Sequence, residues 1–445
     1  MAQAPSRPAI AKVTAPKRPN VVEQDLGGGL HALCVRQAAL PLVEFRLAVP
    51  LAVPQIKKPA SLAVLSESVM AGTEHESRLS LAQAVGGLGG HLGGYVDEDR
   101  FVLTGSVLAQ NLAPFLDLVA DVVSAANYPA AEVRADRGRV ADEISITLSL
   151  PDVIARQALR RRLFGGHPYA TEIPSPAAVR QVSASELRLL HPVLFDEGPA
   201  HLVLVGDVQP ARATAMAGKA LGRWIEGRTA GSRDLPPVRA PRTGPVELVG
   251  RPSSVQSNIR LGGSLPSQSS GDWPAASLAL GIFGGMFSSR LILNLRERNG
   301  YTYSPRSVAR HARAGSTLAI VADVATAVVA PALVEIRYEL GKLVTAGITD
   351  EELELARHHA IGRFSFETAT QPGLATALLD LAVNGAGPGY LSSYPKSVIA
   401  LKKDDVQEAA KRYFAPSGLV TVVIGDPEVV AGSLSSLDDV VVREL

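Results

Sequence analysis

The sequence repeats two strand-like landmarks at nearly the same interval, and this repeat constrains the fold more than any other feature. Phe45-Arg46-Leu47 in the run LVEFRLAV matches Ile259-Arg260-Leu261 in the run SNIRLGG, 214 positions later. Each half also ends in a β-branched run closed by Gly-Asp, HLVLVGD (201–207) and LVTVVIGD (419–426), and the glycines of these runs are 219 positions apart. One match could arise by chance, but two landmarks with similar offsets indicate a duplicated unit of about 210 residues.

The length of the chain agrees with two such units. Its 445 residues exceed the size at which one hydrophobic core stops growing, roughly 250–300 residues. Pro, Gly and Arg are densest in GRTAGSRDLPPVRAPRTGP, which predicts a linker because Pro and Gly stop helices and strands. We expect a disordered N-terminal leader over 1–20, a first domain over 21–226, a linker over 227–246 and a second domain over 247–445.

Hydrophobic periodicity indicates both helices and strands in each half. Helical patterns cover 59–73, 78–87, 111–126, 130–149, 273–298, 327–346 and 351–366, and strand patterns cover 42–49, 100–108, 257–263 and 315–324. The two kinds of element do not alternate strictly, so a parallel βαβ sheet is not favoured. The expected fold class is α+β, with two homologous domains that each pack helices on one face of an antiparallel sheet.

Charge and cysteine content exclude several classes of function. With 44 Lys and Arg against 43 Asp and Glu, the chain has no electrostatic basis for binding nucleic acid or an anionic membrane. The single cysteine, Cys34, excludes a disulfide scaffold and a Cys-based zinc site, and we expect it to be a small buried apolar residue. No window approaches a membrane-spanning length of apolar residues. The N-terminus lacks the apolar core of a signal peptide, which indicates a cytoplasmic protein, although an already removed signal stays open as an alternative.

None of the nine histidines forms the helical pair that a zinc site needs. That pair places two imidazoles one turn apart, as in H-x-x-E-H, whereas His358 and His359 are adjacent. Glu74-His75-Glu76 could hold a metal on a loop, but three consecutive side chains converge poorly. His167 in GGHPYA is typical of a turn. We therefore expect this chain to bind no metal ion by itself.

The glycine-rich stretch GGLGGHLGG (86–94) has neither the Lys-Ser/Thr of a P-loop nor a G-x-G-x-x-G motif after a strand. Glycines also allow another backbone to come close. This property suits a sheet edge that accepts an extended peptide through main-chain hydrogen bonds. We expect Gly93, Gly94 and Tyr95 to contribute to a substrate-binding groove.

Arg296 and Tyr303 lie seven positions apart in SSRLILNLRERNGYTYS (288–304). Without further context, the simplest interpretation is that Arg296 pairs with Glu297 or another acidic residue and that Tyr303 packs. Tyr301 would lie on the same face as Tyr303 in a strand, so these residues alone do not select one tyrosine.

The surrounding segment resembles a motif of the M16 metallopeptidases, the pitrilysin or insulinase-like family. GIFGGMFSSRLILNLRERNGYTYS (281–304) is similar to their G-G-G-M-S-S-R-L…L-R-E-x-x-G-L-A-Y-S. YVDEDRFVLTGSVLAQNLAPFLDLVADVV, FGGHPYA (164–170) and VLVGDV (203–208) are similar to other family segments in the same order. The resemblance implies the two-domain α+β fold of that family.

The chain departs from the family at the zinc motif. Active members carry H-x-x-E-H in the first long helix and a distant Glu as the third zinc ligand. The two histidine positions correspond here to Val64 and Ser68, the catalytic base to Glu67, and the distant ligand to Glu143. Valine cannot bind zinc, serine is a poor ligand, and Glu67 without a metal-activated water has nothing to deprotonate. The resemblance therefore implies that this chain does not hydrolyse peptides alone.

Some bacterial and organellar members of the family act as two different chains around a chamber. One chain carries zinc, and the other lacks the zinc motif and presents an Arg/Tyr pair from its C-terminal half. Arg296 and Tyr303 match that pair in residue type, spacing and surrounding segment. The resemblance thus implies the non-zinc subunit of a heterodimeric M16B-type peptidase, with zinc in the partner subunit.

In this role Tyr303 would stabilise the transition state and Arg296 would hold a substrate carbonyl. The expected substrates are unstructured peptides, including oligopeptides or leader peptides. Two alternatives stay open, a non-catalytic scaffold subunit and a peptide-binding module that acts alone. A homodimeric protease is not favoured, because the histidines are missing.

Overall fold

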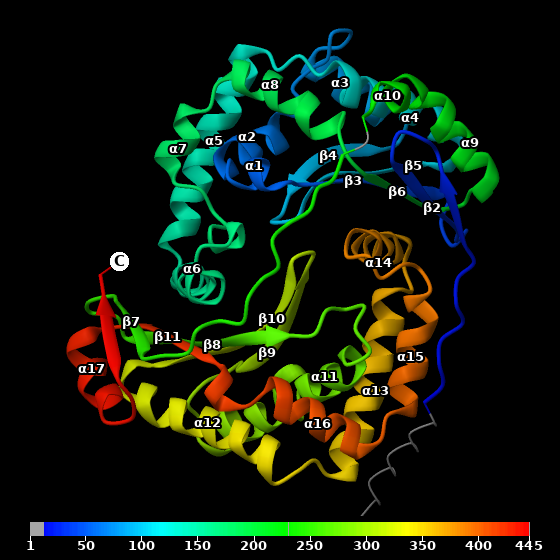
Figure 1. Ribbon diagram of the computed structural model, residues 1–445. Coiled ribbons are helices and arrows are strands. Elements are labelled where there is room, and N and C mark those ends of the chain that lie inside the picture. Colours follow the sequence, from blue (N-terminus) through cyan, green and yellow to red (C-terminus); the bar gives the residue numbers. More distant parts are fainter. Residues whose placement is uncertain (1–12, 230, 445) are drawn as a thin grey trace, which may run out of the picture.

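The computed structural model describes residues 13–229 and 231–444, and it contains two six-stranded sheets, one in each half of the chain (Figure 1). The first sheet has the order β1 (Val21–Asp25), β2 (Leu30–Arg36), β6 (Ala200–Gly206), β3 (Leu42–Pro50), β5 (Arg100–Leu108) and β4 (His91–Val96). The second has the order β12 (Val440–Arg443), β7 (Val246–Gly250), β11 (Val420–Gly425), β8 (Gln256–Leu265), β10 (Gly315–Ala325) and β9 (Arg306–Ala312). The predicted α+β class with two similar halves is confirmed.

The repeated landmarks occupy equivalent places in the two sheets. Phe45 on β3 pairs with Leu204 on β6, and Ile259 on β8 pairs with Val423 on β11, both in antiparallel register. The sheets are mixed and not purely antiparallel, because β2 runs parallel to β6, and β7 runs parallel to β11 and β12. The duplication is thus visible in the register of the central strands.

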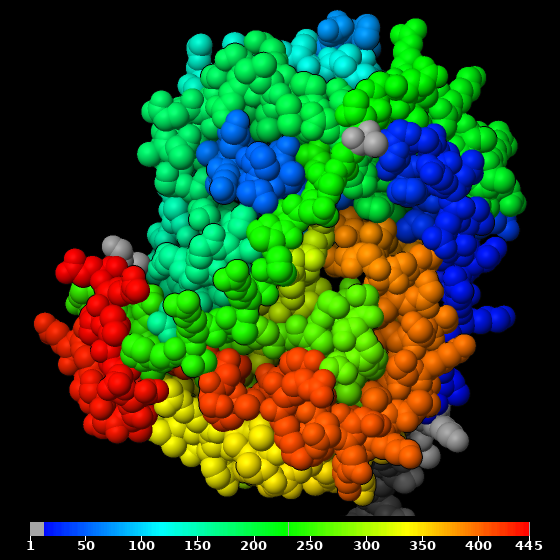
Figure 2. Space-filling model, viewed as in Figure 1, coloured from blue at the N-terminus to red at the C-terminus, as the bar shows by residue number. Residues whose placement is uncertain are grey.

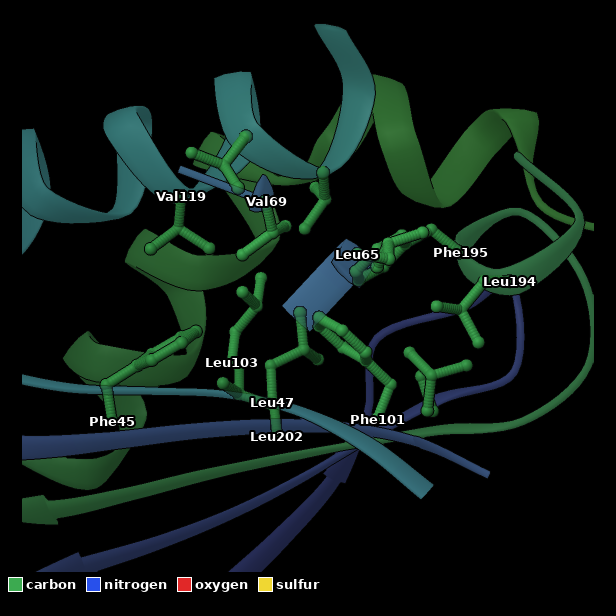
Figure 3. Packing of buried hydrophobic residues seen from close by; sticks show 14 of the residues in the cluster. Phe45, Leu47, Leu65, Val69, Phe101, Leu103, Val119, Leu194, Phe195 and Leu202 are labelled. Carbon is green, nitrogen blue, oxygen red and sulfur yellow. The ribbon is translucent and has the colours of Figure 1, made fainter. Parts of the chain in front are cut away.

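Helices cover one face of each sheet, and the hydrophobic core of each half lies between the helices and the sheet. The first half contributes α1 (Val53–Ile56), α2 (Pro59–Ser68), α3 (Arg78–Gly87), α4 (Leu112–Ala125), α5 (Ala130–Ser149), α7 (Pro176–Gln181), α8 (Ala184–Phe195), α9 (Pro210–Ala220) and α10 (Gly222–Gly227). The second contributes α11 (Trp273–Leu280), α12 (Val329–Thr345), α13 (Asp350–Glu367), α15 (Tyr390–Ala400), α16 (Lys403–Tyr413) and α17 (Pro427–Ser435). Figure 3 shows this packing in the first half, where Phe45 and Phe101 of the sheet face Leu65, Val69 and Phe195.

The other face of each sheet is covered by a helix from the opposite half (Figure 1). Helix α6 (Pro151–Phe164) packs through Ala155 and Leu159 on β8 and β11, and α14 (Gln371–Val383) packs through Leu374 and Leu378 on β3 and β6. Each exchanged helix also makes an ion pair with the sheet that it covers.

In one of these pairs, Nη2 of the buried Arg260 on β8 donates to Asp152 of α6 at 2.7 Å. In the other, Arg100 on β5 donates to Asp380 of α14. These contacts join the two halves into one body.

The connection between the halves is held against the first half. The described residues between α10 and β7 form no helix or strand, and Figure 2 shows this green segment on the surface over the junction. Buried Arg233 donates through Nη2 to the carbonyl oxygens of Val193 and Glu197, each at 2.8 Å. The Pro/Gly-rich segment is therefore fixed by specific contacts along its course.

The predicted leader lies partly outside the described residues, because the description begins at Val13. Residues 13–20 form no helix or strand, and Val13 packs against the core of the second half. In the described parts of the chain, none of the helices combines the length and apolarity required to cross a bilayer. The cytoplasmic location stays a prediction.

Candidate functional site

The positions of the degenerate zinc motif lie where α2 meets α5. Val64 and Ser68, one turn apart on α2, are both buried. The Ser68 hydroxyl donates a hydrogen bond of 2.8 Å to Asp136 Oδ2 on α5. Glu67 is 40% exposed and lies at the rim of this contact. Glu67 and Ser68 thus both contact α5.

An arginine connects the carboxylates at this place. Arg139 Nη2 lies 2.9 Å from Glu67 Oε2 and 3.2 Å from Asp136 Oδ1, and Arg139 Nη1 lies 3.5 Å from Glu143 Oε1. Hydrogen bonding to Glu67 raises the pKa of the Arg139 guanidinium above its ordinary value, which keeps it charged. Arg78 adds a second cation, with Nη2 2.5 Å from Asp136 Oδ2. The carboxylates are therefore neutralised by the chain's own arginines.

These residues do not fit a zinc ion. Val64 has no donor atom, Ser68 uses its hydroxyl proton on Asp136, and both glutamates face a guanidinium. Among the described residues, no three His, Cys, Asp or Glu side chains gather as a metal site. The arrangement predicts a structural link between α2 and α5, and no hydrolytic step can be built on it.

Sequence reasoning identified Glu67, Ser68 and Glu143 but missed Asp136 and Arg139. Positions 136, 139 and 143 are spaced by three and four residues, so they share one face of α5. This spacing was the signal that could have found them.

The histidines considered as alternative ligands have other partners. His75 Nδ1 lies 2.5 Å from Asp121 Oδ1, and this hydrogen bond raises the pKa of His75. His167 accepts from the Tyr169 backbone N–H through Nδ1 and donates through Nε2 to the Pro236 carbonyl at 2.8 Å. His167 therefore holds the linker against the turn.

The glycine-rich stretch begins in the last turn of α3 and ends in β4, the edge strand of the first sheet, which lies beside α2. Within the described ranges β4 pairs with β5 and with no other strand, so its outer edge is open. A Cβ on Gly94 would lie 2.9 Å from the Ser66 carbonyl oxygen and 3.0 Å from the Phe101 ring, whereas a Cβ on Gly93 would meet nothing within 4 Å. Gly94 is therefore needed for packing, and Gly93 leaves space at the surface.

Tyr95 lies on the same edge strand and is 37% exposed. Burial of the rest of the side chain raises the pKa of its phenol. Its hydroxyl thus stays protonated at neutral pH and is able to donate a hydrogen bond.

The predicted continuous helix over 273–298 is wrong. Helix α11 ends at Leu280, a wide π-helical turn η3 (Gly281–Gly285) follows, Met286 is extended, and a second helical segment includes η4 (Ile292–Arg298). A Cβ on Gly284 would lie 2.8 Å from the Ser307 backbone nitrogen on β9. The glycine turn therefore approaches the neighbouring strand too closely for a larger residue at position 284.

The second segment is anchored on its inner side. Arg290 donates through Nε to Glu352 Oε1 at 2.6 Å and through Nη2 to Oε2 at 2.9 Å. Buried Asn294 donates to Glu335 and Glu339 of α12, at 2.7 and 2.8 Å. A side chain on the outer side of this segment is thus carried by a rigid element.

Arg296 and Tyr303 lie together on that outer side. The chain reverses at Gly300, whose φ of +65° favours glycine, and the Tyr301 N–H donates to the Leu295 carbonyl at 2.8 Å. Tyr303 is 78% exposed, and the Arg296 guanidinium carbon lies 4.6 Å from the centre of its ring. Tyr301, which the residues alone do not distinguish from Tyr303, lies against the core of the second half.

Arg296 has two further neighbours. Its Nε lies 3.2 Å from Glu297 Oε1, the pairing that the simplest interpretation of the sequence anticipates. Its guanidinium carbon also lies 5.2 Å from the ring centre of Phe287, which sequence reasoning did not consider. The exposed phenol and the guanidinium could together offer hydrogen-bond donors to a carbonyl oxygen.

Comparison with known proteins agrees with this architecture. The family model for insulinase (peptidase family M16) matches residues 64–177, and the model for the peptidase M16 inactive domain matches residues 181–359. An uncharacterized zinc protease of Mycobacterium leprae is 25% identical over 298 residues, covering 66% of each chain. Another from Streptomyces coelicolor is 25% identical over 299 residues, covering 65% of this chain and 64% of the relative. The matched region spans about two thirds of these relatives' length.

Two solved structures show a similar fold. A peptidase M16 inactive domain from Pseudomonas fluorescens superposes with a TM-score of 0.83 at 22% identity, covering 92% of this chain and 98% of that one. A protease from Helicobacter pylori gives a TM-score of 0.80 at 18% identity, covering 92% and 100%. At these identities the similarity concerns the fold alone.

Proposed function

This chain belongs to peptidase family M16, and from that premise we propose that it is the catalytically incomplete subunit of a heterodimeric zinc peptidase. In this proposal a second M16 chain carries zinc and H-x-x-E-H. The present chain helps to enclose an unstructured peptide and donates Arg296 and Tyr303 to the partner's active site.

The observation that carries the proposal is the difference between the degenerate zinc motif in the first half and the Arg296/Tyr303 pair in the second half. At its own motif, Arg139 faces Glu67 and Glu143, so a metal does not fit. On the second half, Tyr303 is 78% exposed beside Arg296 on an anchored segment. A solvent-exposed phenol that contacts a guanidinium contributes little to the core. It is well placed to bind a ligand that comes from another molecule.

The chemistry of the pair fits amide hydrolysis. Attack on a peptide carbonyl places negative charge on its oxygen, and zinc held by the partner would supply the Lewis acid. A phenol O–H from Tyr303 directed at that oxygen stabilises the developing charge more than it stabilises the substrate. The planar guanidinium of Arg296 can hold a neighbouring main-chain carbonyl, which fixes the register of the peptide.

The edge strand β4 supports a peptide substrate. An extended peptide can add to an open sheet edge through main-chain hydrogen bonds, so its sequence matters less than its lack of folded structure. Gly93 leaves space for the peptide next to the edge, and the close contact between β4 and α2 places this edge beside the degenerate motif. Oligopeptides or leader peptides are therefore suitable substrates.

The open edge also favours one alternative, a peptide-binding module that acts alone. A structural scaffold subunit is a weaker alternative, because it does not need an exposed Arg/Tyr pair. These functions differ in whether the chain contributes to turnover.

A reconstitution experiment tests the proposal. The chain is purified alone and with a co-expressed zinc-type M16 subunit, and cleavage of an unstructured peptide is followed by mass spectrometry with and without chelator. We expect activity only in the mixture, and its loss with chelator. Cleavage by the lone chain, after checks for contaminating proteases, would contradict the proposal, as would a partner that is fully active without this chain.

A matched pair of glycine variants tests the groove. Gly93→Val adds a side chain where the structure has open space, so we expect an unchanged melting temperature and a rise in KM of at least about fivefold in the mixture. Gly94→Ala forces a Cβ against α2, and we expect it to destabilise the chain by about 1–3 kcal/mol in chemical denaturation. Unchanged KM for Gly93→Val would exclude peptide binding along β4.

A further inference from the structure

Resting on the proposed function, we infer that Phe287 is a positioning residue that holds Arg296, and through it Tyr303, in the orientation needed for catalysis. Phe287 follows the glycine turn η3 in the stretch that interrupts the expected helix. It is 72% exposed, so it contributes little to the core. Its position beside Arg296 is what gives it a role.

The Arg296 guanidinium lies close to the rings of both Phe287 and Tyr303. The guanidinium carbon of Arg296 lies 5.2 Å from the ring centre of Phe287 and 4.6 Å from that of Tyr303. Both distances lie within the range in which a cation is attracted by the negative face of an aromatic ring. An exposed arginine side chain is otherwise free to adopt many rotamers, so the two rings restrict its orientation.

The nitrogens of the Arg296 guanidinium differ in their partners. Its Nε side faces Glu297 at 3.2 Å, and within the described residues the two terminal nitrogens have no hydrogen-bond or ion-pair partner. Glu297 occupies the Nε side, and the terminal N–H groups are free to donate to a carbonyl oxygen from outside. Phe287 thus directs the donors of Arg296 without occupying them.

Tyr303 depends on the same guanidinium. Its phenol oxygen has no hydrogen-bond partner in the part of the chain that the structure describes, and its ring is mostly exposed. The contact with Arg296 is therefore the interaction that restrains the ring. Phe287 acts on Tyr303 through Arg296, and loss of its aromatic face should disorder both groups while leaving the core intact.

Matched substitutions separate an aromatic role from a merely apolar one. Phe287→Leu keeps an apolar side chain but removes the ring, whereas Phe287→Tyr keeps the ring. In the two-chain enzyme we expect Phe287→Leu to lower kcat about two- to fivefold and to raise KM, because the guanidinium also holds the substrate, whereas Phe287→Tyr should keep the parent values. Phe366→Leu serves as the control, because Phe366 is 81% exposed on α13 and no cation lies over its ring among the described residues.

A double substitution tests whether Phe287 acts through Arg296. In an Arg296→Gln background the guanidinium is gone, so Phe287→Leu should have almost no further effect on kcat, and the two substitutions should not be additive. Additive losses would overturn the inference, as would wild-type kcat for Phe287→Leu. If Tyr303→Phe has full activity, the catalytic role proposed for Tyr303 fails, and the inference about Phe287 fails with it; if Tyr303→Phe is impaired and Phe287→Leu is not, only the role of Phe287 fails.

Discussion

We expect Tyr303→Phe to lower kcat of the two-chain enzyme by roughly 100- to 1,000-fold, with a small change in KM. The substitution removes one phenol O–H and keeps the ring that packs on Arg296. Loss of a single donor to the developing oxyanion typically costs about 2.7–4 kcal/mol of transition-state stabilisation, which corresponds to this range. The measurement is steady-state cleavage of an unstructured peptide at saturating partner concentration, so that a defect in assembly does not lower the apparent rate.

Tyr301→Phe is the matched control. Tyr301 lies two positions earlier, but it packs against the core of the second half, whereas Tyr303 is exposed. We expect kcat of Tyr301→Phe to stay within about twofold of the parent enzyme, since surface or packing changes of this size alter little else. Equal losses in the two variants would point to a general effect on the segment, and full activity of Tyr303→Phe would leave the heterodimer but refute the assigned role.

The duplication is the part of the fold that the sequence predicted best. Strand runs around Phe45 and Ile259 carry a strong period-two pattern, and both became central strands with matching register. Pattern reasoning succeeds here because side-chain alternation follows from the strand itself. The parallel pairing of β2 with β6 was not predictable in the same way, because it depends on which strands meet after the chain has folded.

The break in the predicted helix over 273–298 shows the limit of periodicity. Apolar residues continue through the glycine turn at a spacing close to that of a helix, so the hydrophobic pattern does not predict that the helix ends there. The interruption lies beside Gly284, where a Cβ would come within 2.8 Å of the Ser307 backbone nitrogen, and Ser307 belongs to a later strand that the local pattern does not include. That break places Phe287 in a turn and beside Arg296, which a continuous helix would not do.

At the degenerate zinc motif, too, the sequence predicts only some of the residues that interact. The sequence located Glu67, Ser68 and Glu143 through family spacing, but it did not reveal what fills the space between them. Arg139 and Asp136 are ordinary charged helix residues until α2 packs on α5. Their role could have been inferred only from their shared helix face with Glu143.

We expect zinc binding to require the removal of Arg139 in addition to the return of two histidines. Val64→His with Ser68→His restores an imidazole pair one turn apart, and Asp136 could accept from the new His at position 68 as it now accepts from Ser68. Arg139 would still present a positive charge between Glu67 and Glu143. Two unit charges 4 Å apart repel by about 4 kcal/mol at an effective dielectric constant of 20, and solvent reduces this at a half-exposed group.

Adding Arg139→Ala should therefore tighten zinc binding roughly 100-fold, or about 2.7 kcal/mol, relative to the double variant. Competition with a chromogenic chelator measures the affinity, and a zinc-dependent rise in melting temperature reports binding to the folded chain without any assay of activity. Arg137→Ala in the double variant is the control, since Arg137 lies on the same helix but donates to the Val182 carbonyl. Equal zinc affinity of the double and triple variants would show that Arg139 does not compete with a metal. A selective gain in the triple variant would establish that the arginine now holds the carboxylates that a metal would otherwise need.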